Sequence, residues 1–79
     1  MLDSKQMSLV YLMEEANRMA TVCTKNVHSL HKKKTNEDIE TQMGRLFSAM
    51  KEVATEFKLS EDHIAEATEN EFQRRLSDK

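Results

Sequence analysis

The chain has 79 residues, with 12 basic and 14 acidic side chains and a formal net charge of −2 at pH 7. This length gives room for one domain, and the near-neutral balance argues against a nucleic-acid binder, which is normally distinctly basic. No run of about 18 apolar residues is present, so we expect no transmembrane helix and no membrane partner. The single cysteine, Cys23, cannot form an intramolecular disulfide, and residues 1–10 lack the pattern of a signal peptide. Both features favour a cytoplasmic location.

The composition favours an all-α fold, because the chain has no proline, one glycine and only scattered β-branched residues. A first long helix is predicted from Asp3 or Ser4 to about Val27, with a capping box between Asp3 and Gln6. Its apolar residues recur every three or four positions, which predicts one inward face. That face consists of Leu9, Leu12, Met13, Ala16, Met19, Ala20, Cys23 and Val27.

Residues 28–36 contain three consecutive lysines and no acidic residue, which predicts a solvated basic loop. Thr35 or Asn36 can cap the second helix, because either side chain can accept a hydrogen bond from the first turn. The clearest apolar periodicity of the chain then predicts the inward face of this helix. Its residues are Ile39, Met43, Leu46, Phe47, Met50, Val53, Ala54 and Phe57. Gly44 lies inside this helix and suggests the close approach of another backbone.

Ser60 is the predicted cap of a third helix, which runs from Glu61 to about Leu76 and is antiparallel to the second. Leu59 and Ile64 have the spacing of a hydrophobic staple around this cap. The residues expected to face inward are Ile64, Ala65, Thr68, Phe72 and Leu76.

The chain is expected to form a single domain over residues 1–79. Below about 80 residues one core rarely supplies more than roughly 3–5 kcal/mol of net stability, and no disulfide is available to add to it. We therefore expect a helical bundle that is completed by assembly into a homo-oligomer, either a dimer or a tetramer.

The first helix also carries a second, polar face. Tyr11, Arg18 and Lys25 lie seven residues apart and therefore fall on one side. One interpretation is a solvated face in which Glu14 and Glu15 form ion pairs with Arg18. The other is an anion site, in which the aromatic ring stacks on a base or sugar while the cations hold phosphate.

Two segments of the chain resemble the MazG-like all-α nucleoside triphosphate pyrophosphohydrolases. They read LMEEANRMATVCTK at residues 12–25 and TQMGRLFSAMKEVATEFKLSEDHI at residues 41–64. The family carries a Glu-Glu-x-x-Glu motif and, on the next helix, a Glu-x-x-Asp motif. The resemblance implies that such acids hold Mg²⁺, which bridges the nucleotide phosphates and helps to activate the attacking water.

The acidic motifs are only partly present in this chain. Glu14 and Glu15 match the first two acids of the first motif, whereas Arg18 stands at its third acid. Gln42 and Arg45 stand where the second motif has Glu and Asp. A guanidinium in place of a ligand carboxylate removes a metal bond and places a like charge beside the cation. The resemblance therefore implies a degenerate site with no catalytic residue, no cofactor and no metal, unless Glu14 and Glu15 hold Mg²⁺.

The leading hypothesis is a catalytically degenerate MazG-like protein that binds or sequesters nucleotides, such as triphosphates or signalling nucleotides, without metal-dependent hydrolysis. The two arginines of the former metal site need a counter-charge, which nearby glutamates or the phosphates of a ligand can supply. The expected ligand-binding residues are Tyr11, Glu14, Glu15, Arg18, Lys25, Gln42 and Arg45.

Two alternatives to this hypothesis stay open. One is an active Mg²⁺-dependent pyrophosphohydrolase, and the other is a protein-interaction module on the same scaffold. By analogy alone, a small degenerate enzyme of this kind suits a phage that interferes with nucleotide signalling.

Overall fold

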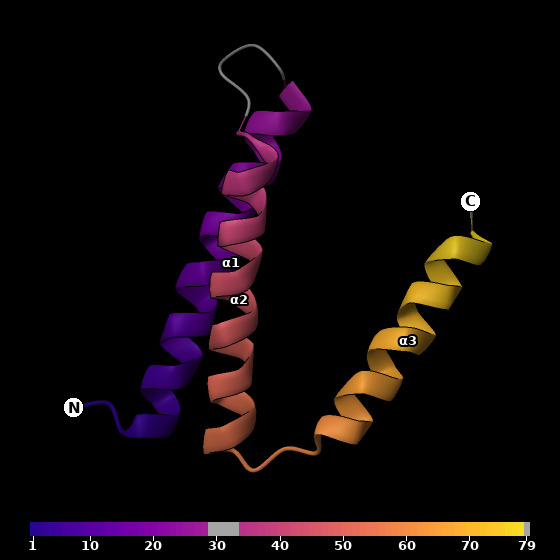
Figure 1. Cartoon of the computed structure of the whole chain (residues 1–79). Coiled ribbons are helices and arrows are strands. Elements are labelled where there is room, and N and C mark those ends of the chain that lie inside the picture. Colours follow the sequence, from indigo (N-terminus) through magenta and orange to yellow (C-terminus); the bar gives the residue numbers. More distant parts are fainter. Residues whose placement is uncertain (29–33, 79) are drawn as a thin grey trace.

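The computed structural model describes residues 1–28 and 34–78, and all the regular structure within them is helical (Figure 1). The helices are α1 (Ser4–His28), α2 (Asn36–Glu56) and α3 (Glu61–Ser77). The predicted all-α class and the order of the helices are confirmed. Residues 29–33, which hold most of the predicted basic loop, lie outside the described residues. In the described part of the chain, no helix is both long and apolar enough to cross a bilayer.

Each helix begins at a predicted cap. The Gln6 N–H donates to Asp3 Oδ1 at 2.7 Å, and the Asp3 N–H donates to Gln6 Oε1 at 3.0 Å. Thr35 and Asp38 form a second capping box. There the hydrogen bond donated by the Thr35 backbone lowers the pKa of the Asp38 carboxyl below its ordinary value of 3.8. The Ser60 hydroxyl accepts a backbone hydrogen bond from the first turn of α3. These caps provide partners for backbone groups that have none within the helix.

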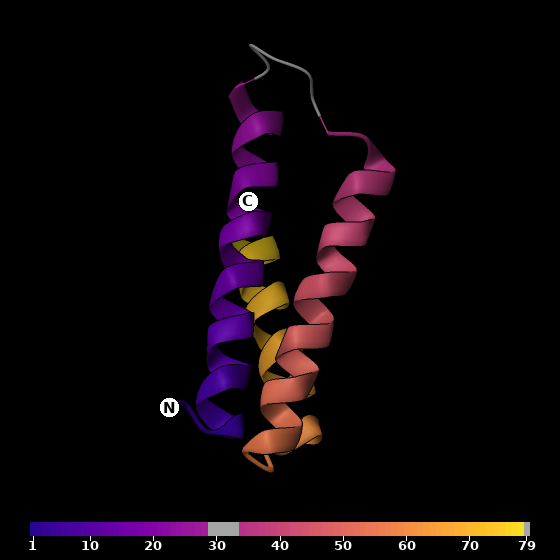
Figure 2. The ribbon, with the colours of Figure 1, turned by 90° about the vertical axis from the view of Figure 1, so that its left-hand side faces the viewer.

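Helices α1 and α2 lie side by side as an antiparallel hairpin (Figures 1 and 2). The residues between them alternate in steps of three and four, which is the spacing of a two-helix seam. This inner seam consists of Ser8, Leu12, Glu15, Met19, Val22 and Asn26 from α1, and of Ile39, Gln42, Leu46, Ala49 and Val53 from α2. Among the described residues, the buried apolar side chains are Ala49, Val53 and Ala54, each 6–8% exposed. The hydrophobic core of a single chain is therefore small.

The residues one position after the inner seam form a second apolar stripe on each helix. They are Leu9, Met13, Ala16, Ala20, Cys23 and Val27 in α1, and Met43, Phe47, Met50 and Ala54 in α2. Phe57, the C-cap of α2, continues the same spacing. A step of one residue turns a side chain by about 100° around the helix axis. Because α1 and α2 are antiparallel, the same step in each helix leads to the same side of the hairpin. We call this side the apolar face.

The predicted inward face of α1 is only partly correct. Leu12 and Met19 line the inner seam, whereas the other six predicted residues lie exposed on the apolar face. The second helix is divided in the same way, and Phe47 is 57% exposed. The reason is that the apolar residues of each helix are divided between two adjacent stripes, and one partner helix covers only one of them.

Helix α3 leaves the end of the hairpin at an open angle, on the side of the apolar face (Figures 1 and 2). A Schellman turn sets its direction: the Leu59 N–H donates to the Ala54 carbonyl at 2.8 Å and the Lys58 N–H donates to the Thr55 carbonyl at 3.2 Å. Lys58 adopts the left-handed conformation that this turn requires, with φ of 53°. This backbone geometry directs α3 away from its own hairpin.

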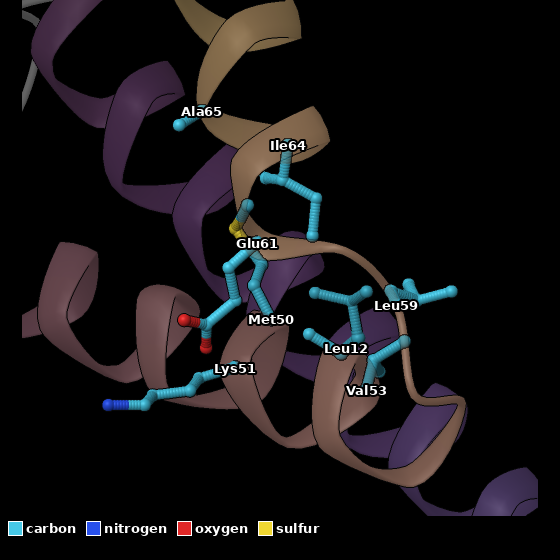
Figure 3. A pocket seen from close by; sticks show the side chains of 9 residues that line it. Leu12, Met50, Lys51, Val53, Leu59, Glu61, Ile64 and Ala65 are labelled. Atoms are coloured by element: carbon cyan, nitrogen blue, oxygen red, sulfur yellow. The ribbon is translucent and has the colours of Figure 1, made fainter.

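Side-chain packing between α3 and the hairpin is confined to the start of the helix. Leu59 and Ile64, the predicted staple, line an apolar cavity of about 410 Å³ together with Met50 and Val53 (Figure 3). Every residue from 61 to 78 is exposed. The prediction that the apolar residues of this helix face inward is therefore wrong for the single chain, because the helix diverges from the surface that they were expected to cover.

The prediction of a close backbone contact at Gly44 is also wrong. Gly44 is exposed, and apart from its own turn of helix backbone no atom of the described residues lies within 4 Å of the position that a Cβ would take. We expect Gly44→Ala to raise the free energy of unfolding by about 1 kcal/mol, since alanine is the better helix former. At fixed protein concentration, the thermal midpoint measured by circular dichroism should rise by about 4–8 °C. An unchanged or lower midpoint would contradict this interpretation of the site.

Candidate functional site

The side of the hairpin opposite the apolar face carries the predicted site residues. The residues one position before the inner seam include Tyr11, Glu14, Arg18, Thr21 and Lys25 in α1, and Asp38, Thr41, Arg45, Ser48 and Glu52 in α2. A backward step of one residue in two antiparallel helices again leads to a common side. We call this side the polar face. It is turned toward the viewer in Figure 2, with α3 behind the hairpin.

A shallow depression of about 310 Å³ lies between the two helices on the polar face. Its lining residues are Tyr11, Glu14, Glu15, Arg18, Arg45, Ser48, Ala49 and Glu52. A second depression, of about 250 Å³, is lined by Val22, Lys34, Glu37, Asp38, Thr41, Gln42 and Arg45. Arg45 belongs to both, so the two depressions form one continuous site around its side chain.

The structure brings six of the seven predicted ligand-binding residues to this site. Lys25 is the exception, because it lies two helical turns beyond Arg18, about 10 Å along the axis, and lines neither depression. The predicted approach of Arg18 and Arg45 across the hairpin is present, with Glu14, Glu15 and Glu52 beside them.

The carboxylate of Glu15 is bound on both of its oxygens. Arg18 Nη1 forms an ion pair with Glu15 Oε1, one turn along the same helix. Gln42 Nε2 donates to Glu15 Oε2 at 3.0 Å and to the Glu15 backbone carbonyl at 3.1 Å. The Glu15 side chain is 12% exposed and Gln42 is 6% exposed, so their contact is largely shielded from water, whereas the Arg18 side chain is 59% exposed. Of the three residues that stand at acidic positions of the resembled motifs, Arg18 and Gln42 thus both bind Glu15, and Arg45 does not.

These residues do not fit a resident Mg²⁺ ion. Mg²⁺ requires oxygen ligands in near-octahedral geometry, but the oxygens of Glu15 already accept hydrogen bonds from protein donors. Glu14 is the other acid that matches the resembled motif. The guanidinium groups of Arg18 and Arg45 line the same depression and would repel a cation there. In residues 1–28 and 34–78, no three His, Cys, Asp or Glu side chains are placed to bind a metal ion together. The network holds α1 and α2 together by direct hydrogen bonds instead.

Arg45 differs from Arg18 in its surroundings. Arg18 is paired with Glu15, whereas no carboxylate of the described residues lies within 4.0 Å of the Arg45 guanidinium nitrogens. The ring of Tyr11 lines the same depression and is 44% exposed. A free guanidinium can bind phosphate through two parallel hydrogen bonds, and an exposed aromatic ring can stack on a base. Glu14 and Glu52 add hydrogen-bond acceptors to the same site.

The lining of the two depressions also includes residues that the sequence did not assign to ligand binding, among them Lys34, Thr41 and Ser48. The signal for two of them is their spacing, because Thr41 and Ser48 lie four residues before and three residues after Arg45. Using that signal requires knowing which stripe of α2 packs on α1. Lys34 is part of the predicted basic loop, and only the position of the loop end beside α2 brings it to the site.

Comparisons of the chain with protein-family models, with curated proteins and with solved structures found no match. The resemblance to the MazG-like proteins therefore stays a prediction. The function has to be inferred from the chemistry of the polar face.

Proposed function

We propose that the chain binds a nucleotide, or another small molecule that carries phosphate, on the polar face, without a metal ion and without hydrolysis. This is the degenerate MazG-like binder that the sequence predicts. The observation that supports it is the difference between the two arginines. Arg18 and Gln42 bind the Glu15 carboxylate, while Arg45, in the same depression, forms no ion pair with any carboxylate of the described residues. A phosphate group then pairs with Arg45 directly, where the resembled family places a metal ion.

The other side chains of the site favour a nucleotide over inorganic phosphate. The exposed ring of Tyr11 offers a stacking surface for a base. Glu14 and Glu52 repel a bare anion, but their carboxylates accept hydrogen bonds from the hydroxyl groups of a ribose or the amino group of a base. A ligand with all three chemical groups satisfies the whole depression, whereas a simple phosphate satisfies Arg45 alone.

The test is isothermal titration calorimetry in EDTA, with nucleoside triphosphates, cyclic dinucleotides and inorganic tripolyphosphate as ligands. We expect a nucleotide to bind more tightly than tripolyphosphate. Arg45→Ala should weaken nucleotide binding by about 10- to 100-fold, because a hydrogen bond to a charged group contributes about 1.5–3 kcal/mol. Lys51→Ala is the matched control, since Lys51 is an exposed cation of α2 that lines neither depression of the polar face.

Two results would contradict the proposal. One is the absence of binding by any of these ligands, and the other is an equal loss of affinity in Arg45→Ala and Lys51→Ala. Mg²⁺-dependent release of pyrophosphate would instead favour the active pyrophosphohydrolase, with Glu14 and Glu15 as ligands. If the chain neither binds nor hydrolyses nucleotides, the protein-interaction module becomes the leading hypothesis.

We also infer that the chain acts as a homo-oligomer, a dimer or a tetramer. The buried apolar side chains of the described residues are two alanines and one valine. A core of this size stabilises a monomer poorly, because a small chain buries too little surface to offset the entropy of folding. Contacts between copies supply the missing burial.

A further inference from the structure

The single chain exposes far more surface than a compact protein of the same length. Its accessible surface is 6717 Å² and its radius of gyration is 15.0 Å. A compact monomer of this length has about 4,900 Å² and about 12 Å, respectively. The excess is about 1,800 Å², more than twice the roughly 800 Å² that each partner buries in a standard interface. An excess of this size matches what one protomer buries in an obligate homodimer.

The exposed apolar surface is concentrated on the apolar face and on α3. The stripes of the apolar face alternate in steps of three and four, which is the spacing with which helices pack in a four-helix bundle. Ile64 lines both the apolar cavity beside Met50 and a shallow, open groove that consists of α3 residues alone, among them Thr68 and Phe72. An isolated helix of 17 residues is marginal in water. Both the apolar face and α3 therefore need to pack against further apolar surface.

We propose that a second copy of the chain covers both surfaces. The two hairpins pack with their apolar faces together as a four-helix bundle, and α3 of each copy lies on the hairpin of the other through Ile64, Phe72 and Leu76. Twofold symmetry is compatible with this arrangement. Each hairpin inserts between the apolar face and α3 of the other copy, so both copies make the same contacts. The Schellman turn after α2 supports it, since this turn directs α3 away from its own hairpin. The proposal rests on the inferred homo-oligomer and assigns its surface.

The test is the mass of the full chain in solution, measured by analytical ultracentrifugation over a range of concentrations. The wild type is expected to be a dimer. Two adjacent positions on α1 form a matched pair: Ala20 lies on the apolar face, and Thr21 lies outside the apolar face, the inner seam and both depressions. Ala20→Glu places a charge in the proposed interface and should weaken the dimer at least a hundredfold, whereas Thr21→Glu should leave it intact.

A second matched pair lies on α3. Phe72 is 55% exposed and lines the groove, whereas Asn70 lies on the opposite side of the same helix. Phe72→Glu should weaken the dimer strongly, although this side chain is largely exposed in the single chain, and Asn70→Glu should not. Circular dichroism at the same concentrations then identifies any variant that has unfolded.

Each outcome of these measurements decides the proposal. Dissociation of Ala20→Glu and Phe72→Glu beside intact controls supports it, whether or not the released chains stay folded. A monomeric wild type overturns both the homo-oligomer and its assigned surface. A wild-type oligomer that survives both interface variants overturns the surface alone. None of these results depends on nucleotide binding, which the calorimetry tests separately.

Discussion

A triple variant, Arg18→Glu, Gln42→Glu and Arg45→Asp, is expected to gain a Mg²⁺ site on the polar face. With Glu14 and Glu15 it holds the five acids of the motifs that the sequence resembles. Without metal these carboxylates repel one another, so the variant should be less stable than the wild type. At a Mg²⁺ concentration of about 100 times its dissociation constant, the metal should add about 2.7 kcal/mol. That gain corresponds to a rise in thermal midpoint of about 10–20 °C, measured by circular dichroism in Mg²⁺ and in EDTA.

Two controls separate this site from a general effect of charge. The wild type should have the same midpoint in Mg²⁺ and in EDTA, because Arg18 and Gln42 already bind the Glu15 carboxylate. Lys51→Glu reverses a charge on α2 away from both depressions and should also be insensitive to Mg²⁺. A triple variant without a Mg²⁺-dependent midpoint would refute the resemblance as a description of this face. An equal shift in the wild type would mean that the site still holds metal.

The hydrogen-bonded pair of Glu15 and Gln42 in the inner seam is expected to contribute strongly to the stability of the hairpin. Gln42→Leu should lower the free energy of unfolding by about 1–3 kcal/mol, because the shielded Glu15 carboxylate loses a hydrogen-bond donor. Adding Glu15→Leu should recover this loss or exceed it, since an apolar pair of similar volume often stabilises more than a buried polar one. Urea denaturation at one fixed protein concentration measures both variants.

The informative quantity is the change in the free energy of unfolding when Glu15→Leu is added to Gln42→Leu, and in particular whether this change is a gain or a loss. If the two substitutions simply add their losses, Glu15 and Gln42 do not act as a unit and the network does not hold the hairpin together. The double variant also releases Arg18 from its partner. It should therefore bind nucleotide at least as well as the wild type, which distinguishes the role of Glu15 in stability from a role in ligand binding.

The helix boundaries could be predicted from the sequence because caps are local. The capping box of Asp3 and Gln6, the box of Thr35 and Asp38 and the cap at Ser60 each depend on residues within one turn. The sequence does not determine the packing of the helices in the same way. Each helix of the hairpin carries two neighbouring apolar stripes, and periodicity alone cannot tell which of them meets the partner helix.

In the candidate site, too, the features that depend on one helix could be predicted and those that depend on helix packing could not. Tyr11 and Arg18 could be placed on one side of α1 from their spacing, and the resemblance added Gln42 and Arg45. The hydrogen bonds of Gln42 to Glu15 could not be predicted, because these residues are 27 positions apart in sequence and meet only through the register between α1 and α2. The open position of α3 could not be predicted either, since it depends on the Schellman turn after α2 and on the left-handed conformation of Lys58.

The proposed function requires that the polar face binds phosphate through arginine and without metal. Calorimetry of the wild type with one nucleotide, in matched buffers containing either EDTA or Mg²⁺, tests it most directly. Because Mg²⁺ neutralises the phosphates that Arg45 would bind, the affinity in EDTA should equal or exceed that in Mg²⁺. Binding that occurs only in Mg²⁺, or a continuous heat of hydrolysis in that buffer, would contradict the claim.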